Sequence, residues 1–264
     1  MSNDHVRSVL EPLERIEQRG FTRYEVFRDW VRLMLATLQR DDGQYLEVLD
    51  SYKRDGGVNG NSCNGGGHRE RGDRNADLFA KAFGKLQQGM GETGRDVLGE
   101  TYEAWGMQSD AFGQHFTPHP VARSMAAMQM GDSGGVEPPV TVCDPACGTG
   151  RLLVMGAREC EQATFCWGQD KDLLCAQMTA LNFCFFNLEG VVVYGDTLTL
   201  ERKRAWRTHH SSVGGSVVEL EEPEAVPVPQ LLEERDSAER SKTDANRLAV
   251  VGQSEQVALT EWSA

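Results

Sequence analysis

A glycine-rich segment at residues 144–150, DPACGTG, has the residue types of a turn that holds a ligand. A β-branched run precedes it and an apolar helical pattern follows it, so a strand-to-helix link is expected. Gly148 and Gly150 have no side chain, which lets a ligand approach the backbone closely. The free amides at the start of the following helix favour a carboxylate or a phosphate. The segment therefore predicts a ligand site at the end of a strand.

An acid at the end of the next apolar run adds the chemistry of a nucleoside site. Asp170 lies twenty residues after Gly150, about the offset at which an acid accepts hydrogen bonds from ribose hydroxyls. Leu153 is too bulky for the third small position of a dinucleotide fingerprint, and Arg151-Leu152 replace the lysine and hydroxyl of a Walker-type phosphate loop. An adenosine ligand without a phosphate chain remains, and S-adenosyl-L-methionine fits this description.

Such a site needs a parallel sheet, because its ligands bind at the carboxyl ends of the strands. Between residues 111 and 200 strand-like and helix-like apolar patterns alternate with short links, which indicates right-handed crossovers. We predict an α/β fold with a Rossmann-like parallel sheet that is incomplete within this sequence. The expected strands are 139–144, 163–170 and 190–196, and the expected helices are 151–160 and 171–187.

A helical N-terminal domain is expected ahead of this sheet. Residues 4–54 and 76–105 carry apolar side chains at three- and four-residue steps, with a break near 89–94. The stretch 55–73 is rich in glycine and asparagine and is typical of a mobile loop. The predicted domains are 1–110 (helical), 111–200 (ligand-binding core) and 201–264 (an acidic, partly disordered tail).

The tail contains few apolar patterns, and only residues 215–220 and 247–252 favour regular structure. Residues 201–210, ERKRAWRTHH, collect four basic residues in an acidic chain. This segment could meet DNA phosphates, with Trp206 stacking on a base. A solvated helix face, or an interface to a missing part, is the favoured alternative.

Composition favours a reduced, cytoplasmic protein. No apolar run is long enough to span a membrane, and no charged-then-apolar leader starts the chain. The seven cysteines include no CxxC pair. Six of them cluster in apolar surroundings, which favours small reduced core residues over a metal site: Cys143, Cys147, Cys160, Cys166, Cys175 and Cys184.

The charge balance limits how the protein can meet nucleic acid. Forty acids face 27 bases, a net charge of −13, and only six of the bases are lysine against 21 arginines. Such a surface is typical of a halophilic source, because strong salt screens self-repulsion, or of a GC-rich genome with ordinary acidic bias. In either case the whole-chain field repels DNA at low salt, so any DNA contact must be local.

Four motifs occur in order: GQHFTPHPVA (113–122), DPACGTGRLL (144–153), GQD (168–170) and GDTL (195–198). In this order and spacing they resemble the N6-adenine DNA methyltransferases, most closely the modification subunit of type I restriction-modification systems. The likeness covers about residues 76–200. It implies binding of S-adenosyl-L-methionine and methyl transfer to the N6 amine of adenine in DNA. The partners it implies are DNA and a restriction-modification subunit.

The resemblance also implies residue roles. The segment 114–119 would flank the methionine end of the cofactor, and Asp144 with the glycine turn would hold its amino-acid moiety. Asp170 would take the ribose hydroxyls and Asp196 the adenine amino group. Structural alternatives stay open: Phe116 as a core residue, Thr117-Pro118 as a helix start, and Asp196 as a turn residue. The candidate cofactor-binding residues are Gln114, His115, Phe116, Thr117, Pro118, His119, Asp144, Ala146, Cys147, Gly148, Thr149, Gly150, Asp170 and Asp196. His115 departs from the usual aromatic, although imidazole can still stack.

No catalytic residue can be nominated. The family orients the target amine and stacks the flipped base with an (N/D/S)-P-P-(F/Y/W) motif shortly after G-D-T-L. The Pro-Pro pair here, residues 138–139, precedes the glycine turn, and beyond Asp196 the single asparagine is Asn246, followed by Arg247. We expect a cofactor-binding family member that is inactive alone. The alternative is an active methyltransferase whose motif comes from a partner chain or was lost by truncation of the reading frame.

Overall fold

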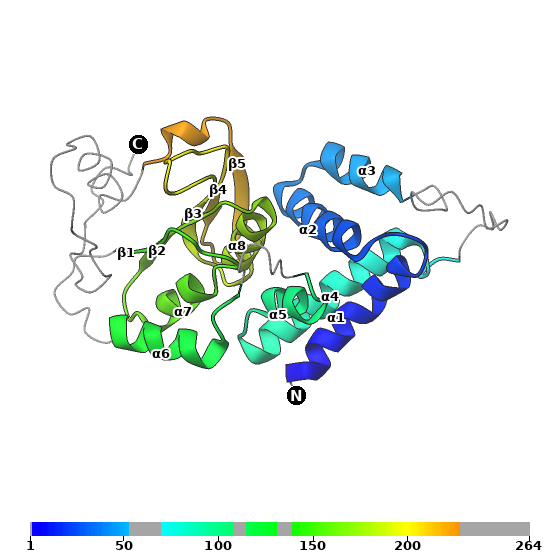
Figure 1. Ribbon diagram of the computed structural model, residues 1–264, viewed down its shortest axis with the longest axis horizontal. Helices are drawn as coiled ribbons and strands as arrows, with labels where there is room; N and C mark the ends of the chain where they lie inside the picture. The colour runs from blue at the N-terminus through cyan, green and yellow to red at the C-terminus, as the bar shows by residue number, and fades with distance from the viewer. Residues whose placement is uncertain (1, 53–69, 108–114, 131–138, 228–264) are drawn as a thin grey trace.

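The computed structural model describes residues 2–52, 70–107, 115–130 and 139–227. Within these residues, helices α1 to α5 lie beside a five-stranded sheet that carries helices α6 to α8 (Figure 1). The predicted α/β fold, with a helical part ahead of a Rossmann-like sheet, is confirmed. Most of the glycine-rich stretch 55–73 lies outside the described residues.

The helical part forms where the apolar spacing predicts it. Thr22 and Glu25 cap the second helix reciprocally, because the Thr22 amide donates to the Glu25 carboxylate (2.9 Å) and the Glu25 amide to the Thr22 hydroxyl (3.2 Å). The expected break near residues 89–94 falls at Gly94, whose φ of 62° ends the fourth helix. The helices are α1 (Ser2–Glu17), α2 (Arg23–Gln39), α3 (Asp42–Ser51), α4 (Asn75–Thr93) and α5 (Val97–Ala104).

The first three strands are parallel and alternate with helices, as predicted. Strand β1 pairs with β2 and β2 with β3, so Asp144 lies opposite Gly168 and Asp170 opposite Tyr194. This register brings the carboxyl ends of all three strands to one edge of the sheet. The elements are α6 (His119–Met130), β1 (Val140–Asp144), α7 (Arg151–Glu159), β2 (Thr164–Asp170), α8 (Leu173–Phe185) and β3 (Glu189–Tyr194).

The sheet continues past residue 200 with two antiparallel strands, β4 (Arg204–His209) and β5 (Ser216–Leu220), and a short 3-10 helix, η2 (Pro223–Ala225). The interpretation of residues 201–210 as a solvated helix face is therefore wrong. The prediction of structure at 215–220 is confirmed by β5, whereas residues 247–252 lie outside the described residues.

Alternate residues of the strands point to opposite faces of the sheet and pack into two separate apolar layers. Cys166, Val192 and Trp206 point to the layer that helices α7 and α8 complete, which is continuous with the core of the helical part. Phe165 and Val193 are among the residues that form a smaller cluster on the opposite face, which Val226 joins after η2. Helix α2 packs on α8 and on β5, so the helical part rests directly against the layer behind the sheet.

Candidate functional site

The glycine turn lies between the carboxyl end of β1 and the start of α7. Gly148 and Gly150 have φ values of 56° and 75°, in the left-handed region that favours glycine. A Cβ atom on Gly148 would lie 3.0 Å from two ring carbons of Phe116, and one on Gly150 would lie 2.8 Å from Cγ2 of Thr179. The predicted need for glycine is thus explained by close contacts within the chain itself.

Asp170 at the end of β2 lies against this turn. Its Oδ2 accepts a hydrogen bond from the Gly148 amide (2.8 Å), and its Oδ1 accepts one from the Asp172 amide (2.8 Å). Burial raises the pKa of the Asp170 carboxyl above its ordinary value, although both amides favour the charged form. The sequence offset therefore located a carboxylate that is in direct contact with the glycine turn.

Asp144, the last residue of β1, and Asp196, in the loop after β3, lie at the same edge of the sheet. The Asp144 carboxylate accepts from the Ala146 amide (3.1 Å), and burial raises its pKa. The Asp196 carboxylate accepts from the Leu198 amide (2.8 Å), which is a turn-forming contact. The next residue, Thr197, donates its hydroxyl to the Pro145 carbonyl (2.6 Å), which joins the two loops. Four sequence-nominated positions thus share one edge: Asp144, Ala146, Asp170 and Asp196.

Of the segment predicted to flank the cofactor, residues 114–119, Phe116 contacts the glycine turn and some other described residues are exposed. Phe116 is half-buried between Gly148 and Tyr102, whose ring centroid lies 5.4 Å from its own. His115 and Pro118 are exposed, whereas the His119 side chain is 9% exposed. Gln114 lies outside the described residues.

A buried polar cluster behind the turn was not found from the sequence. Asp96, at the start of α5, is fully buried and accepts hydrogen bonds from Thr149, Arg151 and Asn182. Arg151 also donates to the Thr117 carbonyl (2.9 Å). The one local signal was the position of Asp96 before a helical run, since it caps α5 through the Gly99 amide (2.7 Å).

The same cluster sets the protonation of His119. Burial, together with the positive charge of Arg151, lowers its pKa to about 4. Its Nε2 lies 3.5 Å from the Glu100 carboxylate, and Arg95 and Asp96 also face it. The imidazole is therefore neutral in the folded protein at pH 7.

We expect this histidine to make stability depend on pH. Between about pH 4 and pH 6.5 the unfolded chain binds a proton at His119 that the folded protein does not, so stability falls as the pH is lowered through this window. The full effect is about 3 kcal/mol. Urea unfolding of the wild type and of His119→Gln at pH 7.5 and pH 4.5 measures it. The variant should lose less stability on acidification, and equal losses would contradict the assignment.

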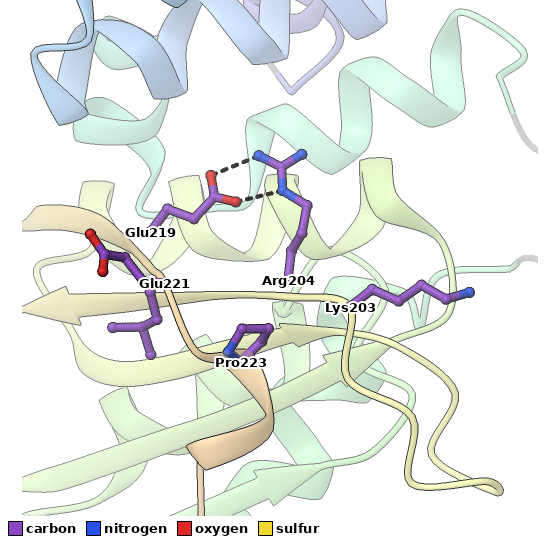
Figure 2. A pocket seen from close by; sticks show the side chains of 6 residues that line it. Lys203, Arg204, Glu219, Glu221 and Pro223 are labelled. Atoms are coloured by element: carbon purple, nitrogen blue, oxygen red, sulfur yellow. Dashed lines mark hydrogen bonds and ion pairs between the residues drawn. The ribbon is translucent and has the colours of Figure 1, made fainter.

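Two surface cavities are lined by residues other than those of the glycine turn. The first, of ≈ 350 Å³, is bounded by β4, β5 and η2, and Figure 2 shows the paired side chains of Arg204 and Glu219 beside it. The second, of ≈ 580 Å³, lies between α2 and the start of α8 and is lined by Arg28, Arg32, Lys171 and Arg204 among others. Its arginines are already paired, Arg28 and Arg32 with Asp29 and Arg204 with Glu219, which limits the positive charge they offer to a ligand.

Metal and thiol chemistry find little support in the described part of the chain. No group of three or more His, Cys, Asp or Glu side chains there is placed to hold a metal ion. The described cysteines are free, and burial raises the pKa of Cys143 and of Cys166 to about 12. These thiols are therefore protonated and poor nucleophiles at neutral pH. No helix of the described residues is both long and apolar enough to cross a membrane.

Comparison with known proteins identifies the segment that carries this site. The family model described as N-6 DNA Methylase matches residues 93–213, which include the glycine turn, Asp170 and Asp196. No curated protein matches the sequence. One similar solved structure is the methyltransferase subunit of a type I restriction-modification system from Streptococcus thermophilus. It is 12% identical with a TM-score of 0.38, and the match covers 71% of this chain and 56% of that one.

Proposed function

We propose that this chain, whose residues 93–213 match the N-6 DNA methylase family model, is a member of that family that binds S-adenosyl-L-methionine at the carboxyl ends of β1, β2 and β3. The observation that carries the proposal is the contact between the Asp170 carboxylate and the Gly148 amide (2.8 Å). It brings an acceptor for ribose hydroxyls against a backbone turn in the arrangement that nucleoside sites use.

The chemistry of the donors and acceptors fits this cofactor. Each Asp170 oxygen accepts one hydrogen bond from a backbone amide. A lone pair remains on each oxygen for the two hydroxyls of a ribose. The first amides of α7 have no partner within the helix and suit the carboxylate of an amino-acid moiety. Asp196 is half-buried on the adjoining loop, and in this proposal its carboxylate accepts a hydrogen bond from the adenine amino group. When bound, the cofactor would supply an activated methyl group.

The family activity extends the proposal to DNA. We propose that the protein acts in methylation of the adenine N6 amine, with DNA and a restriction-modification subunit as partners. The chain of 264 residues contains no (N/D/S)-P-P-(F/Y/W) motif after Asp196. A role in cofactor binding, with the catalytic motif supplied from outside these 264 residues, therefore fits the residues present.

Calorimetric titration with S-adenosyl-L-methionine tests the cofactor proposal. We expect binding by the wild type in molar salt, where an acidic chain folds best, and weaker binding by Asp170→Asn. The loss should be roughly 1–3 kcal/mol, as for a hydrogen bond to a charged group. Asparagine is close in size but keeps only one acceptor oxygen, so the substitution removes the charge and one of the two hydrogen bonds from backbone amides.

A matched control separates this loss from a general effect of charge. Glu161→Gln removes an exposed carboxylate before β2, at the opposite end of that strand from Asp170. It should bind the cofactor as the wild type does. No heat of binding by the wild type at any salt concentration, with the protein shown to be folded, would reject the proposal.

A further inference from the structure

We propose that Asp96 and Arg151 are positioning residues through which helix α5 fixes the shape of the cofactor turn. The inference rests on the proposed function for the identity of the ligand. It goes beyond that function because it makes the helical part of the chain a component of the cofactor site. The helical part, α1 to α5, would then be required for binding even though it supplies none of the nominated cofactor contacts.

Asp96 connects three elements through one buried carboxylate. It is 0% exposed, and its Oδ1 accepts from the Gly99 amide of α5 (2.7 Å) and from Nδ2 of Asn182 in α8 (2.8 Å). Its Oδ2 accepts from the Thr149 hydroxyl (2.6 Å) and from Nε of Arg151 (3.1 Å). Thr149 lies between the two glycines of the turn, so Asp96 holds the turn from behind.

Arg151 extends the same connection to the segment in front of the turn. It is 4% exposed, and its Nη1 donates to the Thr117 carbonyl (2.9 Å) while its Nη2 donates to the Glu103 carboxylate of α5 (3.1 Å). Its guanidinium carbon lies 5.9 Å from the centre of the Phe116 ring. One side chain therefore fixes both α5 and the Thr117 backbone relative to the first residue of α7.

Asn182 reinforces the turn from the opposite helix. The same Nδ2 that donates to Asp96 also donates to the Thr149 carbonyl (2.8 Å). Thr149 is thus held by its side chain to α5 and by its backbone to α8. The neighbouring Gly148 carbonyl accepts from the Thr179 hydroxyl (2.8 Å), a second contact from α8.

A structural role alone is a poor account of this arrangement. A buried ion pair recovers little net free energy, because desolvation of both charges offsets their attraction, and apolar residues of similar size would join α5 to the sheet as well. What the charged pair adds is a set of hydrogen bonds with defined directions. Its hydrogen bonds end on atoms of the turn and of segment 115–119, the atoms whose placement a bound cofactor requires.

Conservative variants with two readouts test the inference. Asp96→Asn keeps the shape and one acceptor oxygen but removes the anion opposite Arg151. We expect it to weaken binding of S-adenosyl-L-methionine by at least about 10-fold. Amide hydrogen exchange at residues 147–151 should become faster while exchange in β3 is unchanged. Glu103→Gln is a milder variant, because that carboxylate is partly exposed, and it should weaken binding by about 3-fold.

A matched control removes a buried hydrogen bond elsewhere. Tyr52→Phe deletes the hydroxyl that donates to Asp29 (3.1 Å) in the helical part, without any contact to the turn. It should lower thermal stability and leave both cofactor affinity and exchange at residues 147–151 unchanged. Equal loss of affinity in Tyr52→Phe and in Asp96→Asn at matched loss of stability would show a merely structural role and overturn the proposal.

The exchange readout keeps this inference separate from the proposed function. If the wild type does not bind the cofactor, the proposed function fails, but faster exchange at residues 147–151 in Asp96→Asn still supports positioning of the turn by α5. Unchanged exchange there overturns the inference whether or not the cofactor binds. If Asp96→Asn does not fold, Glu103→Gln decides: wild-type affinity together with wild-type exchange overturns the inference.

Discussion

Replacing Trp206 with alanine is expected to lower the free energy of unfolding by about 3–5 kcal/mol, the cost of removing a large aromatic side chain from a packed core. Trp206 is 0% exposed in the structure. Its strand, β4, is paired on both sides, so that Trp206 lies opposite Val192 in β3 and Glu219 in β5. Because β4 is not an edge strand, its own backbone has little freedom to move into a cavity at this position.

Urea unfolding in molar salt measures this change. Trp206→Phe keeps most of the buried volume and should lose much less stability. Val213→Ala alters a side chain that is 95% exposed in the loop before β5, and should change stability by no more than about 0.5 kcal/mol. A base-stacking role for Trp206 predicts the reverse pattern. DNA affinity would then fall in Trp206→Ala while stability stayed within about 0.5 kcal/mol of the wild type, as for a surface substitution.

The segment around Trp206 shows why strand β4 could not be found from its own sequence. Its arginines give it the composition of a solvated or DNA-binding face. In the structure Arg204 pairs with Glu219 and Arg207 with Glu189, each at 2.6 Å. These acids come from neighbouring strands, and a sequence pattern read locally contains no information about such pairs. Strands β1 to β3 were predictable because their apolar runs are continuous.

The candidate site, too, could be predicted from the sequence only in part. The contact between Asp170 and the glycine turn was predictable, because parallel strands bring their carboxyl ends together whatever the details of packing. The role of Asp96 was not, since its partners Thr149, Arg151 and Asn182 lie 53 to 86 residues away. Arg151 was visible in the sequence only as the residue that excludes a Walker-type loop.

The basic residues of segment 201–210 also bear on DNA binding. Lys203 pairs with Glu201 (3.1 Å), Arg204 and Arg207 pair with acids of the sheet, and Arg202 donates to the Val226 carbonyl. These cations are engaged within the protein rather than presented as a continuous positive surface. With a net charge of −13, the chain offers little to attract the phosphates of DNA by itself.

The purified chain alone is therefore expected to transfer no methyl group to adenine in DNA. The adenine N6 amine is a poor nucleophile, because its lone pair is delocalised into the ring. A transferase must flip the base, stack it, and orient the amine with hydrogen-bond acceptors. The sequence after Asp196 contains no proline-bounded polar turn with an adjacent aromatic that could do this. A bound cofactor without those groups leaves the amine unpositioned.

Transfer of tritiated methyl groups to unmethylated DNA of mixed sequence, across a salt series, measures this activity. Calorimetry in the same buffers shows whether the protein is folded and binds the cofactor. A lack of label then means that methyl transfer itself does not occur. Label from the lone chain that disappears in Asp144→Ala would contradict the prediction, because it would require a catalytic element within these 264 residues. Label that appears only when neighbouring gene products are co-expressed would favour an enzyme assembled from two chains. In that case the cofactor turn, Asp170 and the Asp96–Arg151 pair would act on an adenine that the second chain presents.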